Sequence, residues 1–155
     1  MADKRRGDKT MNYKKSHMDQ KCRPYATKAI ENGCNILEVD IQSACGKIVL
    51  GHNWRPKLPF LFDCTLENYL KRVPFGVMVQ LDIKEICLTD RSRKKFAERI
   101  ADVINKYKDE ITFLISANNG FYRPLTSDYV RDESKLIYWS NWKDGKIIET
   151  VDLWK

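Results

Sequence analysis

The chain has 155 residues, of which 43% are hydrophobic, and this length and composition predict one domain with a buried core. Lysine and arginine outnumber aspartate and glutamate by 28 to 21, and the formal net charge of +7 favours an anionic partner such as a phosphorylated small molecule, nucleic acid or a phospholipid surface. Five cysteines without a Cys-x-x-Cys pair argue against a zinc site, and the lack of an apolar run of about 20 residues or of a secretory signal indicates a cytoplasmic protein.

The N-terminal residues are strongly basic and show no hydrophobic period. We therefore expect a disordered basic arm over residues 1–13 and a single domain over residues 14–155. In chain order, the predicted elements are a helix at 24–32, strands at 34–42 and 46–53, a helix at 65–73, a strand at 76–84, a helix at 92–108, and strands at 111–118 and 135–141. This alternation is typical of a parallel α/β sheet or barrel.

Two of the predicted helices have recognisable first residues. Pro24 suits the first turn of its helix, because the N–H that proline lacks needs no partner there, and Gly33 follows the last turn as a stop. Thr65 suits the N-cap of the next helix, because its hydroxyl can accept a hydrogen bond from a free backbone N–H.

One predicted strand carries two carboxylates, Glu38 and Asp40, inside an apolar run. Residues two apart in a strand share a face, so these side chains project together, and the same spacing puts Asp82 and Lys84 on one face of another strand. Like charges this close repel unless a cation shares them, and hard oxygen ligands suit Mg²⁺ or Ca²⁺. The alternative is that both carboxylates lie on the solvent side of a half-exposed strand.

The chain has two histidines, His17 and His52, and each lies at the junction between an extended run and a loop. Reactive groups gather at the carboxyl ends of parallel strands in α/β folds. A lone histidine is more often a packing or surface residue. Two histidines on either side of the strand with Glu38 and Asp40 favour a functional site.

Five stretches in a fixed order resemble a known family: SHMDQ, AIENGCNILEVDI, GKIVLGHN, TLENYL and VQLDIKE. The set covers roughly residues 14–86 and resembles the phosphatidylinositol-phospholipase-C-like phosphodiesterases, most closely the glycerophosphodiester phosphodiesterases. The resemblance implies a TIM-barrel-like fold, shortened to about five or six βα units because such barrels typically have about 250 residues. Two positions differ from the family pattern: Met18 follows His17 where the family has arginine, and Asn53 follows His52 where it has aspartate.

The resemblance implies a role for each candidate residue in the hydrolysis of glycerophosphodiesters or phospholipid head groups. The implied positions are Glu38, Asp40 and Asp82 as ligands of one divalent cation, Mg²⁺ or Ca²⁺, His17 and His52 as the acid–base pair, and Lys84 as a phosphate contact. Two further substrate contacts are expected: Arg23, in place of the missing arginine, and Trp139, near the end of the last predicted strand. Trp139 and Trp142 are also explained as core or interface aromatics.

Other functions remain open from the residues alone. LDIKE also fits the Asp-x-Lys strand of restriction-endonuclease-like nucleases, with Asp82 binding metal, Lys84 positioning water, and Asp40 or Asp63 as the second carboxylate. A shortened barrel could instead bind phosphorylated ligands without turning them over, or be completed by another chain in an oligomer. A plain nucleic-acid-binding module is less well supported, because the basic residues lack an aromatic-interleaved motif.

Overall fold

The structure is a computed structural model that describes residues 12–21, 24–52, 65–84, 89–117, 136–138, 143, 146 and 148–153. The elements are β1 (Tyr13–Ser16), η1 (Asp19–Lys21), α1 (Thr27–Glu31), β2 (Ile36–Ala44), β3 (Lys47–Leu50), α2 (Leu66–Leu70), β4 (Met78–Ile83), α3 (Asp90–Tyr107), β5 (Thr112–Ala117), β6 (Leu136–Tyr138) and β7 (Ile148–Val151). The mixed α/β class that the alternation predicts is confirmed.

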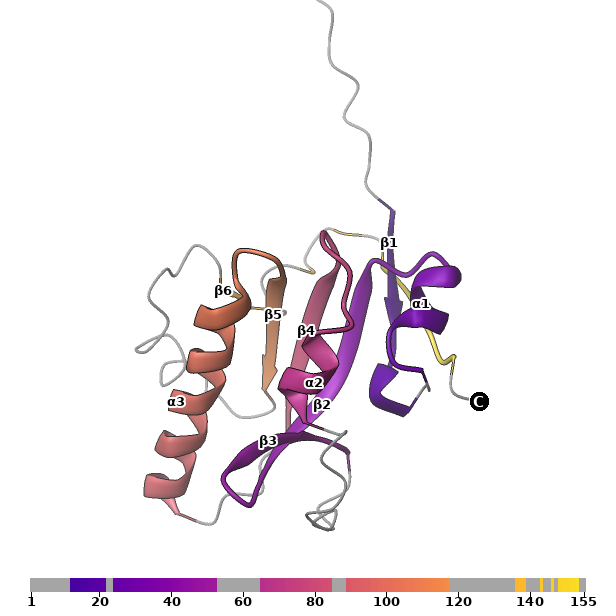
Figure 1. The fold of residues 1–155 in the computed structure, drawn as a ribbon. Helices are drawn as coiled ribbons and strands as arrows, with labels where there is room; N and C mark the ends of the chain where they lie inside the picture. Colours follow the sequence, from indigo (N-terminus) through magenta and orange to yellow (C-terminus); the bar gives the residue numbers. More distant parts are fainter. Residues whose placement is uncertain are drawn as a thin grey trace, which may run out of the picture.

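The sheet has the strand order β6-β5-β4-β2-β1-β7, and every neighbouring pair on this path is parallel (Figure 1). β3 lies off this path and pairs antiparallel with β2. A short turn at Cys45 and Gly46 joins them, and both residues have positive φ (48° and 74°), as a type I′ hairpin turn requires. Because the six strands on the path are parallel, their carboxyl ends meet at one edge of the sheet.

The first and last strands in chain order, β1 and β7, are absent from the predicted set of elements. β1 begins at Tyr13, so it takes this residue from the predicted basic arm, and residues 1–11 lie outside the described part of the chain. Its polar sequence forms a strand because β2 and β7 pair with it on both sides, and pairing outweighs intrinsic propensity. β7 has no counterpart among the predicted strands, because four residues give too short a pattern to recognise.

The first two helices are shorter than predicted, whereas the long third helix is confirmed. α1 begins at Thr27, so the expectation that Pro24 lies in its first turn is wrong. Ala26, the residue before this helix, has a non-helical backbone with a φ of 63°. Its N–H donates a hydrogen bond of 2.9 Å to the Asp19 carboxylate. Thr65 caps α2 as predicted, and α3 begins at Asp90 after a similar cap at Thr89.

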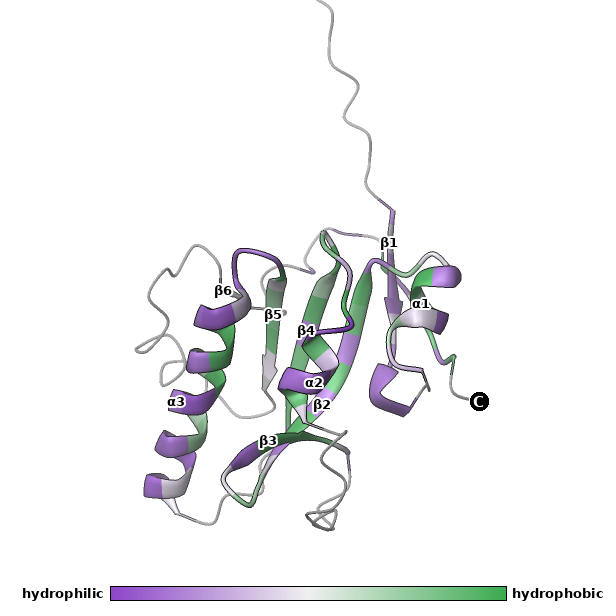
Figure 2. Cartoon of the chain, in the orientation of Figure 1, coloured by the Kyte–Doolittle hydropathy of each residue, from purple (hydrophilic) through white to green (hydrophobic). Residues whose placement is uncertain are grey.

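The three helices α1, α2 and α3 lie on one face of the sheet (Figure 1). Their apolar residues pack with Leu37, Val39 and Ile41 of β2 and with the matching residues of β4 and β5 in one core. Figure 2 shows the hydrophobic side of α3 turned toward the strands. Phe96 and Ile100 are among the buried residues of this helix. No helix in the described part of the chain is long and apolar enough to cross a membrane.

The opposite face of the sheet is polar although it is buried. Along β2, Glu38, Asp40 and Gln42 alternate with the core residues, and each is less than 5% exposed. Gln80 of β4, beside Glu38 in the register, is buried as well. Buried polar and charged side chains destabilise a fold unless they are paired, so this face must contain partners for them.

Candidate metal and acid–base site

Three carboxylates from two neighbouring strands converge on the polar face. Glu38 and Asp40 belong to β2 and Asp82 to β4, and the parallel register pairs Asp40 directly with Asp82. One carboxylate oxygen of each residue lies within 4.8 Å of those of the other two. The structure therefore brings together the three residues that the sequence predicts as metal ligands.

Two buried oxygens at this cluster accept no hydrogen bond within the described residues: Gln80 Oε1 and Asp82 Oδ1. A buried acceptor without a donor costs about 1–3 kcal/mol. Such oxygens fit the preference of Mg²⁺ and Ca²⁺ for carboxylate and carbonyl ligands, and the three converging side chains are all carboxylates, without sulfur or imidazole, which argues against a softer metal. The donor set thus fits a hard divalent cation.

Two lysines bracket the carboxylates. Lys84 Nζ lies 2.7 Å from Asp82 Oδ2 and 3.1 Å from Asp40 Oδ1, and Lys15 Nζ donates a hydrogen bond to Glu38 Oε2. Burial lowers the pKa of Lys84, but the hydrogen bond to Asp82 and the charges of both carboxylates outweigh it, so the pKa lies above its ordinary value of 10.5. Lys84 therefore stays charged at neutral pH. Three carboxylates and two ammonium groups leave the cluster with one net negative charge.

His17 lies at the carboxyl end of β1 and joins the cluster from the side of Glu38. Its backbone N–H donates to the Val151 carbonyl at 2.9 Å, which fixes it against β7. The ring nitrogen Nδ1 lies 2.6 Å from Asp152 Oδ1, and Nε2 lies 3.5 Å from Glu38 Oε1. One ring nitrogen thus faces a carboxylate that orients it, while the other faces the candidate metal ligands.

Gln20 supports Asp40 from the short helix η1. The Gln20 amide Nε2 donates to Asp40 Oδ2 at 2.6 Å, and Asp40 N donates to Gln20 Oε1 at 3.2 Å. This reciprocal pair fixes both the backbone and the side chain of Asp40. Asp40 therefore presents its other oxygen, Oδ1, towards Lys84 and the cluster.

Asp19 is buried next to the site but has a structural role. Its carboxylate accepts hydrogen bonds from Ser16 Oγ (3.2 Å), Ala26 N (2.9 Å) and the Tyr69 hydroxyl (2.7 Å). Burial raises the pKa of this carboxyl above its ordinary value of 3.8, although the hydrogen bonds to Tyr69, Ala26 and Ser16 act in the opposite direction. Asp19 thus ties β1, α1 and α2 together around the residues that follow His17.

The remaining predicted residues are less closely tied to the cluster. His52 follows β3 and is exposed, and Gly51 N donates to the Asp40 carbonyl at 2.9 Å, so the backbone before His52 lies beside Asp40. Arg23 and Trp139, expected as substrate contacts, lie outside the described residues, as do Asp63 and Trp142.

Three residues of the site are absent from the sequence-based set: Lys15, Gln20 and Asp152. Lys15 shares a face with His17 by the alternation of β1, so recognising this strand would have revealed it. Asp152 follows the unrecognised strand β7. Gln20 lies in a single turn of 3-10 helix, for which the sequence has no periodic signal.

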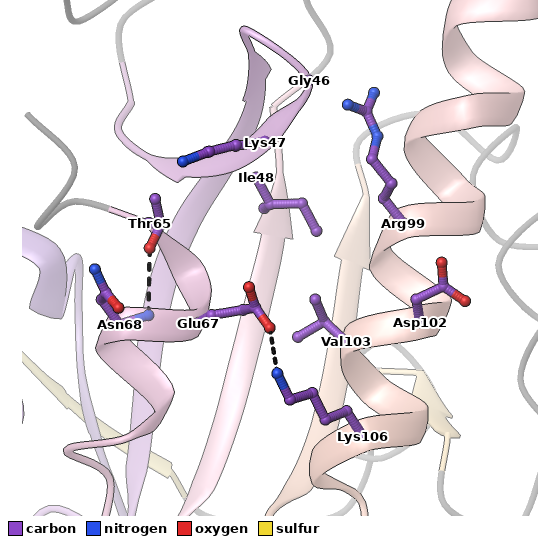
Figure 3. A pocket seen from close by; sticks show the side chains of 10 residues that line it. All are labelled: Gly46, Lys47, Ile48, Thr65, Glu67, Asn68, Arg99, Asp102, Val103 and Lys106. Atoms are coloured by element: carbon purple, nitrogen blue, oxygen red, sulfur yellow. Dashed lines mark hydrogen bonds and ion pairs between the residues drawn. The ribbon is translucent and has the colours of Figure 1, made fainter. Parts of the chain in front are cut away.

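A hollow of about 400 Å³ lies on the helix-covered face, between the β2–β3 turn, α2 and α3 (Figure 3). Glu67 and Lys106 form an ion pair of 2.7 Å across it, and this hydrogen bond raises the pKa of the exposed Lys106 above 10.5. Arg99 and Asp102 add one charge of each sign to its wall. None of the predicted site residues lines this hollow, so we place the candidate chemistry on the polar face instead.

Neither a protein-family model nor a curated protein matches this sequence. The resemblance to phosphodiesterases therefore rests on the ordered motifs alone. Function has to be argued from the geometry of the polar face.

Proposed function

We propose that this protein is a metal-dependent phosphodiester hydrolase that acts on glycerophosphodiesters or phospholipid head groups. The observation that carries the proposal is the convergence of Glu38, Asp40 and Asp82 within 4.8 Å, with His17 Nε2 3.5 Å from Glu38. Hydrolysis of a phosphodiester requires stabilisation of negative charge on the phosphate oxygens and a group that moves a proton. The cluster offers both at the carboxyl ends of parallel strands.

We further propose that the fold is a shortened TIM-barrel-like sheet. From β1, the strands β2, β4, β5 and β6 follow in chain order on one side, and β7 lies on the other side, as the last strand of a barrel would. The helices of the described residues cover one face, whereas a doubly wound sheet carries helices on both. The polar face with the carboxylates would then be the interior of the barrel.

The residues divide into cation ligands and a phosphate contact. Glu38, Asp40 and Asp82 would hold one Mg²⁺ or Ca²⁺ ion. When bound, this ion supplies charge stabilisation for the phosphate oxygens in the transition state. Lys84, whose ammonium group lies beside Asp40 and Asp82 at the carboxyl end of β4, would donate a hydrogen bond to a phosphate oxygen.

His17 is the proposed proton-transfer group. Asp152 accepts a hydrogen bond from Nδ1–H, which leaves Nε2 as the basic nitrogen, and Nε2 faces the cluster. A histidine in this state can take a proton from water or from a neighbouring substrate hydroxyl. His52 is proposed as the second proton-transfer group, which protonates the leaving alcohol, because the Gly51–Asp40 backbone bond keeps it at the same edge of the sheet.

The overall charge is consistent with this class of substrate. A net charge of +7 favours phosphorylated molecules and anionic membrane surfaces. We propose that Arg23 and Trp139 contribute to the substrate pocket. An oligomer that completes the barrel is a further proposal, which light scattering of the purified chain would test.

The direct test is hydrolysis of glycerophosphocholine by the purified chain with Mg²⁺ or Ca²⁺. We expect metal-dependent release of choline or glycerol phosphate by the wild type, and loss of this activity in His17→Ala, His52→Ala and Glu38→Ala. General acid–base groups are typically worth about 10²–10⁴ in rate, so the loss should be of at least this order. The matched control is Glu67→Ala, which removes an exposed carboxylate from the opposite face. Activity that survives the first three changes would show that the site is wrong.

One specific observation favours a second candidate, a metal-dependent nuclease. Lys84 lies between Asp40 and Asp82, which is the carboxylate and Asp-x-Lys set expected for that class. This function leaves Glu38, His17 and the His17–Asp152 contact without roles, so we rank it second. Cleavage of plasmid DNA in preference to glycerophosphocholine would reverse the ranking.

A third outcome is binding without turnover. A chain that binds Mg²⁺, Ca²⁺ or glycerol phosphate in a calorimeter, but hydrolyses no diester, would have kept the ligands without the catalytic activity. The missing arginine at Met18 is the feature of this chain that favours that outcome.

A further inference from the structure

Lys15 is a buried cation on the polar face whose position the proposed chemistry does not explain. It lies two residues before His17 on the same face of β1, its side chain is only 10% exposed, and Nζ donates a hydrogen bond to Glu38 Oε2. Lysine is almost never buried without a charged partner. The Glu38 carboxylate is the charged partner of this buried ammonium group.

We propose that Lys15 is a resident counter-ion of the cation site, whose ammonium group competes with a divalent cation for Glu38 and thereby sets the affinity of the site. This inference rests on the proposed function only in taking Glu38 as a cation ligand. Lys15 acts through Glu38 and does not touch substrate, so it is a positioning residue rather than a catalytic one.

The charges of the cluster support this role. Glu38, Asp40 and Asp82 carry three negative charges, and Lys15 and Lys84 carry two positive charges, which leaves one net negative charge. A site without lysines would repel itself in the absence of a cation. With both lysines present, the carboxylates stay together without the ion, and an incoming divalent cation must displace or oppose an ammonium group.

The two lysines are not equivalent. Lys84 bridges Asp40 and Asp82 at the end of β4, where its side chain is 19% exposed and can turn to a phosphate. Lys15 contacts Glu38 from nearer the amino end of β2, because Lys15 pairs in register with Ile36, the first residue of that strand. Its charge therefore acts on the cation site and not on the substrate.

The test is a calorimetric titration of the purified chain and its variants with Mg²⁺ or Ca²⁺ alone. Lys15→Gln removes the charge but keeps an amide that can donate to Glu38, so we expect cation binding to become about tenfold tighter or more. Lys15→Arg keeps the charge and should bind with wild-type affinity. The matched control is Lys14→Gln on the same strand, because Lys14 points to the other face and pairs with Glu149 at 3.6 Å.

Each outcome decides the matter. Unchanged or weaker binding by Lys15→Gln, while the wild type still binds, would overturn the counter-ion role and leave the proposed function standing. Absence of cation binding in both the wild type and Lys15→Gln would overturn the counter-ion role and the proposed function together, whereas binding by Lys15→Gln alone would support the counter-ion role. If Lys15→Gln needs the cation to fold, Lys15→Arg provides the decision, because tighter binding by this charged variant would contradict the proposal.

Discussion

His17 is oriented by a residue 135 positions later in the chain, Asp152. The contact depends on the pairing of β1 with β7, because His17 N donates to the Val151 carbonyl. With Nδ1 held by the carboxylate, Nε2 is the nitrogen available to exchange a proton on the side of Glu38. At the scale of single residues, the proposed activity therefore depends on a pair that joins the two ends of the described chain.

Replacing Asp152 by alanine tests this pair. We expect kcat to fall about tenfold or more with little change in KM, because the imidazole stays but loses its preferred tautomer and orientation, whereas removal of the imidazole itself typically costs about 10²–10⁴. The measurement is steady-state kinetics on glycerophosphocholine. Glu149→Ala is the control, since Glu149 lies on the other face of β7. A normal kcat in Asp152→Ala would remove Asp152 from the mechanism.

At the scale of elements, Asp19 joins β1, α1 and α2 through its three hydrogen bonds. Its position explains why α1 begins late, at Thr27, because the carboxylate holds Ala26 N outside the helix. The same burial raises the pKa of Asp19. The junction that shapes the residues after His17 therefore contains a carboxyl group that is costly to ionise.

The pH dependence of stability follows from this shift. Because the folded-state pKa of Asp19 is raised above 3.8, the folded protein binds the proton more tightly than the unfolded chain does. The contribution of Asp19 to stability is present below pH 3.8 and is lost as the pH rises through the folded pKa. Asp19→Asn does not titrate, so we expect its stability relative to wild type to increase between about pH 3 and pH 7, as measured by urea unfolding. A constant difference across this range would contradict the prediction.

The sequence predicts an element well where its hydrophobic residues repeat with a clear period, and poorly where the element is short and polar. α3 was predictable because Phe96, Ile100 and Ile104 repeat at helical spacing. The common face of Glu38 and Asp40 was predictable because side chains alternate along β2. β1 and β7 were not predictable, because short polar strands are stabilised by partners far along the chain. The carboxylate cluster could be predicted because its residues lie on the recognisable strands β2 and β4. Lys15 and Asp152 could not be predicted, because they belong to β1 and to the residues after β7.

The whole molecule separates two kinds of chemistry by the two faces of one sheet. The helix-covered face contains the apolar core, and the other face contains buried carboxylates, lysines and His17. The parallel strand order brings the carboxyl ends of β1, β2 and β4 side by side, so residues from separate parts of the sequence converge there. The proposed function thus depends on the topology as much as on the residues.

The most direct test of the central claim is the number of divalent cations that each chain binds. In a calorimetric titration with Mg²⁺ and with Ca²⁺, we expect one ion per wild-type chain, with a dissociation constant in the range known for carboxylate sites, up to about 1 mM. Glu38→Gln, Asp40→Asn and Asp82→Asn should each bind at least about tenfold more weakly, because each loses one charged ligand. Glu67→Gln should match the wild type. Wild-type protein that binds neither ion, or binding that these three substitutions leave unchanged, would contradict the account.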